Sequence, residues 1–293
     1  MSSSSSSSPA SPLSPPSPPS PLSPSAVVGR LRAGGCVFAE EEARLLIAAA
    51  RTPDELAAMV ERRVAGLPLE HVLGWAEFCG LRIAVDPGVF VPRRRTEFLV
   101  RTAAALTRRD SGGSSGPARA VVVDLCCGSG ALGAALAAVL KRDGVPVGLH
   151  AADIDPAAVR CARRNVAPFG GRVYEGDLYA PLPATLRGRV GVLIANAPYV
   201  PTGELGLLPP EARVHEPRTA LDGGTDGLAV QRRVIAAARR WLAPGGRLLV
   251  ETGGHQAART AAAVARGGLV PEVAGCEELE ATVVVGTRPA GAG

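Results

Sequence analysis

The chain has 293 residues, more than one typical domain and fewer than three, which favours one main domain with a smaller accessory domain. Hydrophobic residues make up 46% of the sequence and charged residues 20%, enough apolar material for a sizeable core, so disorder throughout the chain is excluded. The net charge of +5 comes from basic residues spread along the chain, which leaves a nucleic acid or an RNA-associated partner open without selecting one.

The sequence disfavours both membrane insertion and secretion. A membrane span needs about 18 uncharged residues, whereas the longest apolar runs are strand-sized. The first residues have neither the basic start nor the continuous apolar core of a signal peptide. The cysteines form no Cys-x-x-Cys pair and the histidines are not at ligand spacing, which predicts reduced thiols without a metal site or a disulfide framework. We therefore expect a cytoplasmic protein that does not bind a membrane.

The N-terminal third predicts a tail, a small helical domain and a connector. Residues 1–25 are almost entirely Ser and Pro, a composition that cannot offset its ordering entropy, so we expect a disordered tail. Residues 39–50 and 53–65 show helical periodicity, with Thr52 as an N-cap, and predict a helical domain over 26–75. Residues 77–91 alternate around Asp86-Pro87-Gly88, which predicts a hairpin within a connector over 76–118 that also holds a helix.

From residue 119 to the end, short apolar strands alternate with Ala-rich helices, which predicts a doubly wound α/β domain with a mostly parallel sheet covered on both faces. The predicted strands are Val121 to Leu125, Gly148 to Ala152, a short strand before Glu175, Val190 to Ala195, Arg247 to Glu251 and Thr282 to Thr287. The predicted helices are Ala131 to Leu140, Ala157 to Asn165, Leu228 to Leu242 and Gln256 to Arg266.

The segment Val121 to Gly133 carries the first chemical motif, a buried strand that runs into a glycine turn and a helix. Gly128 and Gly130 let the backbone approach a nucleotide-like cofactor, and the helix N-terminus offers unpaired N–H groups. The Gly-x-Gly-x-x-Gly spacing also fits a dinucleotide site, but it is a weak signal on its own.

Three acids at three successive strand ends favour S-adenosylmethionine over NAD, because this ligand has a cationic sulfonium and no phosphate. We expect Asp124 to reach its amino-acid portion, Asp153 to accept both ribose hydroxyls, and Asp177 to meet the adenine amino group.

A loop after the fourth strand, Asn196-Ala197-Pro198-Tyr199, carries the second motif. Ligands of doubly wound sheets bind beyond the carboxyl ends of the strands, so this loop should face the cofactor. The Asn196 side-chain oxygen and the Ala197 backbone carbonyl can each accept one N–H of a planar NH₂ group, and Tyr199 can stack on that group. The motif predicts a catalytic and substrate-binding loop.

Together these motifs resemble the class I S-adenosylmethionine-dependent methyltransferases and, within them, the HemK/PrmC protein-(glutamine-N5) methyltransferases. The family hallmark Asn-Pro-Pro-Tyr, also shared with DNA adenine and RNA guanine methyltransferases, reads Asn196-Ala197-Pro198-Tyr199 here. Residues 89–97 (VFVPRRRTE) are similar to the Pro-Arg-Pro-x-Thr-Glu signature. Residues 215–235 (HEPRTALDGGTDGLAVQRRVI) resemble a stretch typical of the glutamine enzymes. The resemblance covers about residues 66–287.

The resemblance implies a seven-stranded sheet, a substrate-docking N-terminal domain, and methylation of a glutamine side-chain amide in a protein. The implied substrate is the Gly-Gly-Gln loop of a peptide release factor or a ribosomal protein, with nucleic acid involved only indirectly. The resemblance adds Cys126, Leu178 and Asn196 to the cofactor contacts, and Glu216 and Pro217 to the substrate contacts. No metal is implied.

Two departures from the family pattern concern the site. Ala197 replaces the first proline, but the acceptor is a backbone carbonyl, and Pro198 still confines Ala197 to extended conformations. Cys126 stands where the family often has glycine.

Three alternatives stay open at this point. The same loop could methylate an exocyclic base amine in RNA or DNA, although DNA enzymes usually carry a substantial recognition domain. The chain could also bind the cofactor without catalysis. An NAD oxidoreductase would need a proton donor that the sequence does not identify.

Overall fold

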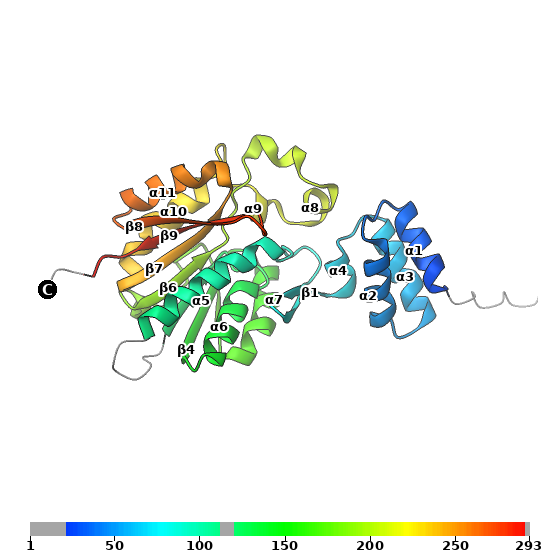
Figure 1. Ribbon diagram of the computed structural model, residues 1–293, viewed down its shortest axis with the longest axis horizontal. Helices are drawn as coiled ribbons and strands as arrows, with labels where there is room; N and C mark the ends of the chain where they lie inside the picture. Colours follow the sequence, from blue (N-terminus) through cyan, green and yellow to red (C-terminus); the bar gives the residue numbers. More distant parts are fainter. Residues whose placement is uncertain (1–21, 112–119, 291–293) are drawn as a thin grey trace, which may run out of the picture. The chain divides into compact units, whose positions relative to one another are not determined.

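The computed structural model describes residues 22–111 and 120–290, which form two compact units, one ending at Val64 and the other beginning at Ala65 (Figure 1). Most of the predicted tail lies outside the described residues. Its last residues differ from the prediction, because the Ser23 hydroxyl accepts a hydrogen bond from the Ala26 amide and Pro24 begins a helix. Serine at the N-cap followed by proline is a favourable helix start, so the helical unit begins inside the predicted tail.

The first unit consists of three helices that share one apolar core. They are α1 (Pro24–Ala33), α2 (Ala39–Ala49) and α3 (Pro53–Val64). Thr52 caps α3 as predicted, its hydroxyl accepting from the Glu55 amide at 3.1 Å. A buried ion pair joins α2 to α3, since the Arg63 guanidinium donates to both carboxylate oxygens of Glu42 at 2.6 and 3.0 Å. Such a two-bond pair fixes the relative rotation of the two helices.

The second unit starts with α4 (Leu69–Leu73) and an antiparallel hairpin of β1 (Trp75–Phe78) and β2 (Leu81–Ala84). The predicted boundary at residue 75 therefore falls inside this unit. The predicted turn at Asp86-Pro87-Gly88 is wrong, because the strands turn at Cys79 and Gly80, which both have positive φ. Two positive φ angles are what a tight two-residue hairpin needs, and a cysteine gives no sign of that conformation in a sequence.

The main sheet has seven strands in the order β5-β4-β3-β6-β7-β9-β8, which confirms the predicted doubly wound, mostly parallel architecture. Only the pairings of β9 with β7 and with β8 are antiparallel. The strands are β3 (Ala120–Leu125), β4 (Val147–Asp153), β5 (Arg172–Glu175), β6 (Val190–Ala195), β7 (Leu242–Thr252), β8 (Val270–Cys276) and β9 (Ala281–Thr287). The carboxyl ends of β3, β4 and β6 lie at one edge, as in-register parallel pairing requires.

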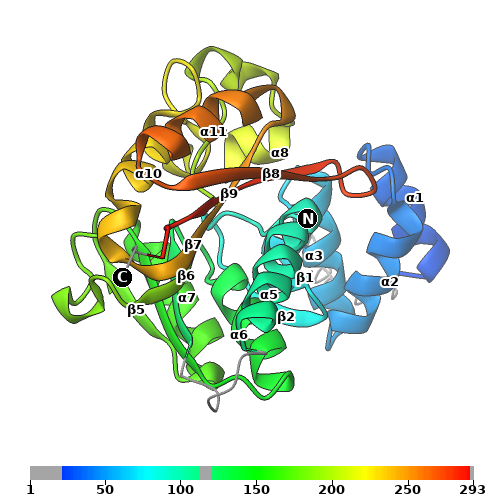
Figure 2. The same cartoon turned by 60° about the vertical axis from the view of Figure 1, so that its left-hand side comes forward.

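Helices cover both faces of this sheet, as Figures 1 and 2 show. On one face lie α5 (Glu97–Ser111), α6 (Ala131–Arg142) and α7 (Pro156–Val166), and on the other α10 (Ala229–Trp241) and α11 (Ala257–Arg266). Successive residues of β3 show the alternation, since Val122 belongs to the first core and Val123 to the second. Two short helices, α8 (Pro210–His215) and α9 (Arg218–Leu221), lie between β6 and α10. Within the described residues, five short 3₁₀ helices connect these elements: Arg94–Thr96, Ala167–Phe169, Ala184–Leu186, Thr202–Leu207 and Gly254–Gln256.

Within residues 22–111 and 120–290, every helix falls short of the length or apolar character that crossing a bilayer demands.

The buried pair in the first unit predicts a large and specific loss of stability on truncation. Arg63→Ala leaves the Glu42 carboxylate buried without its partner, and we expect a loss of about 3–5 kcal/mol in the unfolding free energy measured with urea. Arg32→Ala removes an exposed ion pair with Glu40 and should cost about 0–1 kcal/mol. Equal losses for the two variants would contradict the stabilising role of the buried pair.

Candidate functional site

A cavity of about 580 Å³ opens at the carboxyl ends of the parallel strands. Its wall is built from the turn after β3, the end of β4, the residues after β5 and the loop after β6, together with α9 and the start of α10. Of the predicted cofactor residues, those that line this cavity are Cys126, Gly128, Asp153, Asp177, Leu178 and Asn196. The structure therefore brings most of the predicted cofactor residues to one cavity.

The glycine turn after β3 has the open surface that a bound ligand requires. Gly128 and Gly130 both have positive φ, as glycine readily adopts. A Cβ at Gly130 would lie 3.1 Å from Ala162 and Val166, whereas a Cβ at Gly128 would meet nothing within 4 Å. Gly130 thus serves close packing on α7, and Gly128 leaves space on the cavity side. Cys126 adopts φ 55°, a conformation that costs a non-glycine residue about 1 kcal/mol.

Asp153 links the end of β4 to the glycine turn. One carboxylate oxygen accepts from the Gly128 amide at 2.8 Å and the other from the Asp155 amide at 2.9 Å. Burial raises the pKa of Asp153, and these two amides oppose the rise. Each carboxylate oxygen can still accept a second hydrogen bond, so the predicted contact with two ribose hydroxyls is chemically feasible.

Asp177 and Leu178 form the wall of the cavity beyond β5. The Asp177 carboxylate makes an ion pair with Arg233 of α10, which lines the same cavity and whose own pKa is raised by this contact. Leu178 has a φ of 49°, a left-handed backbone conformation that few non-glycine residues adopt. The predicted adenine contact of Asp177 would share the carboxylate with Arg233.

Asp124 lies beneath the cavity and is not part of its wall. Its Oδ2 accepts from the Gly133 amide at 2.8 Å, and a Cβ at Gly133 would lie 3.0 Å from the same oxygen. Its Oδ1 is buried and has no hydrogen-bond partner among the described residues. Burial raises the pKa of Asp124 to about 7. A direct contact between Asp124 and a cofactor stays a prediction.

The loop after β6 lies between two cavities. Asn196 lines the first cavity and also a second one of about 540 Å³, which Arg93, Arg95 and Tyr199 line as well. Pro198 faces only the first cavity and Ala197 only the second. The Asn196 amide nitrogen donates to the Thr96 hydroxyl at 3.5 Å, which leaves the side-chain oxygen available as an acceptor. The loop can therefore hold a group in the second cavity against a ligand in the first.

Tyr199 is oriented by a buried carboxylate at the end of β7. Its hydroxyl donates to Glu251 Oε1 at 3.3 Å, and Arg95 Nε lies 3.5 Å from the same oxygen. The Arg95 guanidinium also sits over the Tyr199 ring, 5.8 Å from its centroid. Burial raises the pKa of both Tyr199 and Glu251, so the tyrosine stays a neutral hydroxyl.

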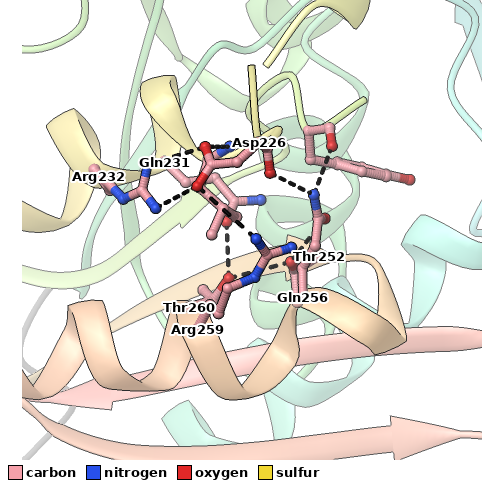
Figure 3. A network of polar contacts seen from close by, with 9 residues as sticks. Asp226, Gln231, Arg232, Thr252, Gln256, Arg259 and Thr260 are labelled. Atoms are coloured by element: carbon pink, nitrogen blue, oxygen red, sulfur yellow. Dashed lines mark hydrogen bonds and ion pairs between the residues drawn. The ribbon is translucent and has the colours of Figure 1, made fainter. Parts of the chain in front are cut away.

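The backbone of the loop is held by Gln256, whose carboxamide uses its hydrogen-bonding capacity in full. The nitrogen donates to the carbonyls of Tyr199 at 3.0 Å and Asp226 at 3.3 Å. The oxygen accepts from the Gly253 amide at 3.3 Å and the Thr252 hydroxyl at 3.5 Å. Figure 3 shows Gln256 and Thr252 beside Asp226 in this network. One side chain thus connects the loop after β6, the segment before α10 and the end of β7.

Close packing explains the glycines of the segment 222–227. A Cβ at Gly227 would lie 2.3 Å from both the Tyr199 carbonyl oxygen and the Gln256 amide nitrogen, and one at Gly223 would lie 2.5 Å from the Gly227 carbonyl oxygen. Neither position can carry a side chain without moving backbone. The Asp-Gly-Gly-x-Asp-Gly pattern is therefore a steric requirement of the loop that it supports.

Glu216 and Pro217, the other predicted substrate contacts, lie in different surroundings. Pro217 lines the first cavity. Glu216 is buried, accepts from the Val91 amide at 3.2 Å and pairs with Arg93 at 2.6 Å, so it joins the C-terminal end of α8 to the connector. Its predicted substrate contact stays a prediction.

Three residues that hold the loop, Thr96, Glu251 and Gln256, were not predicted as site residues, because single polar residues at strand and helix ends form no recognisable sequence pattern.

Three comparisons place this chain among known proteins. Residues 81–207 match the family described as "Methyltransferase small domain". The chain is 43% identical over 210 residues to the "Release factor glutamine methyltransferase" of Geobacter sulfurreducens, a match that covers 70% of this chain and 68% of that protein. It is 39% identical over 203 residues to the "4-amino-L-phenylalanine/4-methylamino-L-phenylalanine methyltransferase" of Streptomyces pristinaespiralis, covering 68% of this chain and 65% of that protein.

A solved structure supports the fold alone. The "Methyltransferase from Pyrococcus furiosus" superposes with a TM-score of 0.50 at 14% identity, covering 80% of this chain and 98% of that chain.

The buried Asp124 predicts a pH dependence of stability. Its pKa rises from an ordinary value of 3.8 to about 7, so the folded protein binds the proton more tightly than the unfolded chain does. Stability is therefore lost as the pH rises from about 4 to about 7. The Asp124→Asn variant lacks this titration. Between about pH 4 and about pH 7 the unfolding free energy of the wild type should therefore fall relative to that of the variant. A pH-independent difference would contradict the raised pKa.

Gln256→Leu should loosen the loop after β6, because it leaves the carbonyls of Tyr199 and Asp226 without their donor. We expect a loss of about 1–3 kcal/mol in unfolding free energy and faster hydrogen exchange of the peptide spanning the loop. Gln231→Leu is the matched control, because the hydrogen bonds of that buried glutamine go to the Glu251 carbonyl at 3.0 Å and to the Thr260 hydroxyl at 3.1 Å, both outside the loop. Equal exchange of the loop peptide in both variants would contradict the specific role of Gln256.

Proposed function

The chain belongs to the family of release factor glutamine methyltransferases, and from this membership we propose that it methylates the side-chain amide nitrogen of a glutamine in a peptide release factor, with S-adenosylmethionine as the methyl donor. The observation that carries the proposal is the place of Asn196 on the wall shared by both cavities. A donor in the first cavity and an amide in the second would meet at this residue.

The first cavity has features that fit S-adenosylmethionine. Gly128 leaves open space beside the backbone, and Asp153 retains acceptor capacity for ribose hydroxyls. The two arginines of the cavity wall, Arg218 and Arg233, are each paired with an aspartate, so neither is a free cation for a phosphate. When bound, this donor supplies an electrophilic methyl group on a sulfonium. The acids Asp153 and Asp177 would hold its sugar and base.

The loop residues would orient the acceptor amide. The side-chain oxygen of Asn196 and the backbone carbonyl of Ala197 accept its two N–H groups, which turns the nitrogen lone pair toward the first cavity. Amide nitrogen is a poor nucleophile, so the two acceptors contribute by positioning it and by stabilising the positive charge that develops on it. The proton that the nitrogen then loses can pass to water.

Residues behind the loop keep these acceptors in place. The Thr96 hydroxyl accepts from the Asn196 amide nitrogen, which fixes the side-chain oxygen as the free acceptor. Arg95 and Glu251 hold the Tyr199 ring, which can stack on the planar amide. None of these residues needs to change protonation state during methyl transfer.

Asn196→Ala should lower the rate of glutamine methylation by about a hundredfold or more, because the amide loses one of its two acceptors. Binding of S-adenosylmethionine, measured by calorimetry, should stay within a few-fold of wild type. The reaction is followed with labelled donor and a release factor that carries a Gly-Gly-Gln loop. Ala197→Pro is the matched control and should keep the activity, because the acceptor at this position is a backbone carbonyl.

The same assay separates the proposal from its alternatives. Replacing the loop glutamine of the release factor with glutamate should abolish labelling. Labelling of RNA, DNA or 4-aminophenylalanine in place of the release factor would assign the acceptor to another amine, and normal labelling by Asn196→Ala would reject the role of the loop.

A further inference from the structure

Four arginines line a third cavity, on the surface and away from the loop after β6. Arg187, Arg239, Arg240 and Arg288, here called the arginine cluster, line a cavity of about 570 Å³. The remaining lining residues are Gly188, Ala236 and Gly267. Arginine is thus the only charged or polar residue type in this lining.

The fold brings these arginines together from three separate elements. Arg239 and Arg240 belong to the last turn of α10, and the Gly188 amide donates to the Arg240 carbonyl at 3.1 Å. Arg288 follows β9, and its guanidinium donates to the Arg239 carbonyl at 3.2 Å. The Arg187 guanidinium lies 5.4 Å from the centroid of the Trp241 ring. Backbone pairing and ring packing therefore fix the cluster in one place.

The cluster carries unbalanced positive charge. Among the described residues, Arg187, Arg239 and Arg240 are exposed and take part in no ion pair. The stretches of chain that carry the lining residues, 187–190, 236–247, 265–269 and 287–288, contain further arginines and no Asp or Glu. The helix dipole explains cations in the last turn of α10, but not Arg187, which lies outside that helix. Repulsion among these like charges would be relieved by a bound anion.

We propose that the arginine cluster binds the phosphodiester backbone of a nucleic acid. Guanidinium groups match phosphate with paired hydrogen bonds. A protein partner would need apolar area at the centre of its interface, and Ala236 is the only apolar side chain in the lining. No aromatic ring lines the cavity, and Trp241 is buried, so the contact reads phosphates and not bases.

The cluster lies at the opposite edge of the sheet from the loop that carries Asn196. Val190 pairs with Leu242 at the amino ends of β6 and β7, whereas Asn196 follows the carboxyl end of β6. A strand of six residues spans about 20 Å. A nucleic acid on the cluster therefore leaves the loop accessible, and this inference does not depend on the proposed function.

The test compares two triple variants that remove the same charge. Arg187→Gln/Arg239→Gln/Arg240→Gln removes the exposed part of the cluster and keeps Arg288, which binds backbone carbonyls. Arg142→Gln/Arg160→Gln/Arg163→Gln removes three exposed arginines from the opposite face of the sheet. Binding of fluorescein-labelled oligouridine and oligodeoxythymidine of equal length is measured by anisotropy over a salt series, with circular dichroism to verify folding.

We expect the cluster variant to bind about tenfold more weakly at low salt. The plot of log K against log salt should become less steep by about 2, because each phosphate contact with a single strand contributes about 0.7 to its negative slope. The control variant should keep most of the wild-type affinity and slope. The ratio of the two oligonucleotide affinities identifies RNA or DNA as the source of the backbone.

Three results would overturn the proposal. They are absence of binding by the wild type at low salt, equal weakening of the two folded triple variants, and equally tight binding of polyglutamate of the same charge. The last result would show general attraction to anions and not recognition of phosphate.

Discussion

The hydrogen bonds of one buried carboxamide determine where the loop after β6 lies. Gln256 donates to the carbonyls of Tyr199 and Asp226 and accepts from residues at the end of β7, so three segments distant in the sequence share one side chain. Gly227 lets those segments approach to a distance that no Cβ would permit. A buried polar group with all of its bonds satisfied resists displacement, because any movement would leave donors or acceptors unpaired. The position of Asn196 between the two cavities depends on this arrangement.

The carboxylates of the site differ in how they are satisfied. Asp153 has an amide at each oxygen and keeps capacity on the cavity side, whereas Asp124 has one amide and one buried oxygen without a partner among the described residues. Glu251 and Glu216 are buried beside arginines. Of these four acids, Asp153 therefore faces the ligand space, whereas the other three hold backbone or side chains around it. The division follows from burial and partners, and not from residue type.

Much of the fold and part of the site could be predicted from the sequence. Alternation of apolar strands and helices gave the doubly wound sheet, because burial on two faces imposes that pattern on every element. The glycine turn and the Asn196 loop were recognisable because their chemistry needs fixed residue types at fixed spacing. The hairpin turn was misplaced, since Cys79 adopts positive φ only in the context of its strands. Thr96, Glu251 and Gln256 were missed because their roles arise from contacts across the sheet, which spacing does not record.

The loop after β6 owes its shape to neighbours, and this has a consequence for how such proteins are found. Ala197 is fully buried, and its carbonyl is presented by a backbone that Gln256 and the glycines of the next segment hold from outside. These contacts hold the loop without a proline ring at position 197. A sequence signature that requires two consecutive prolines would miss chains like this one, whereas a signature that pairs the asparagine with the distant glycine-rich stretch would include them.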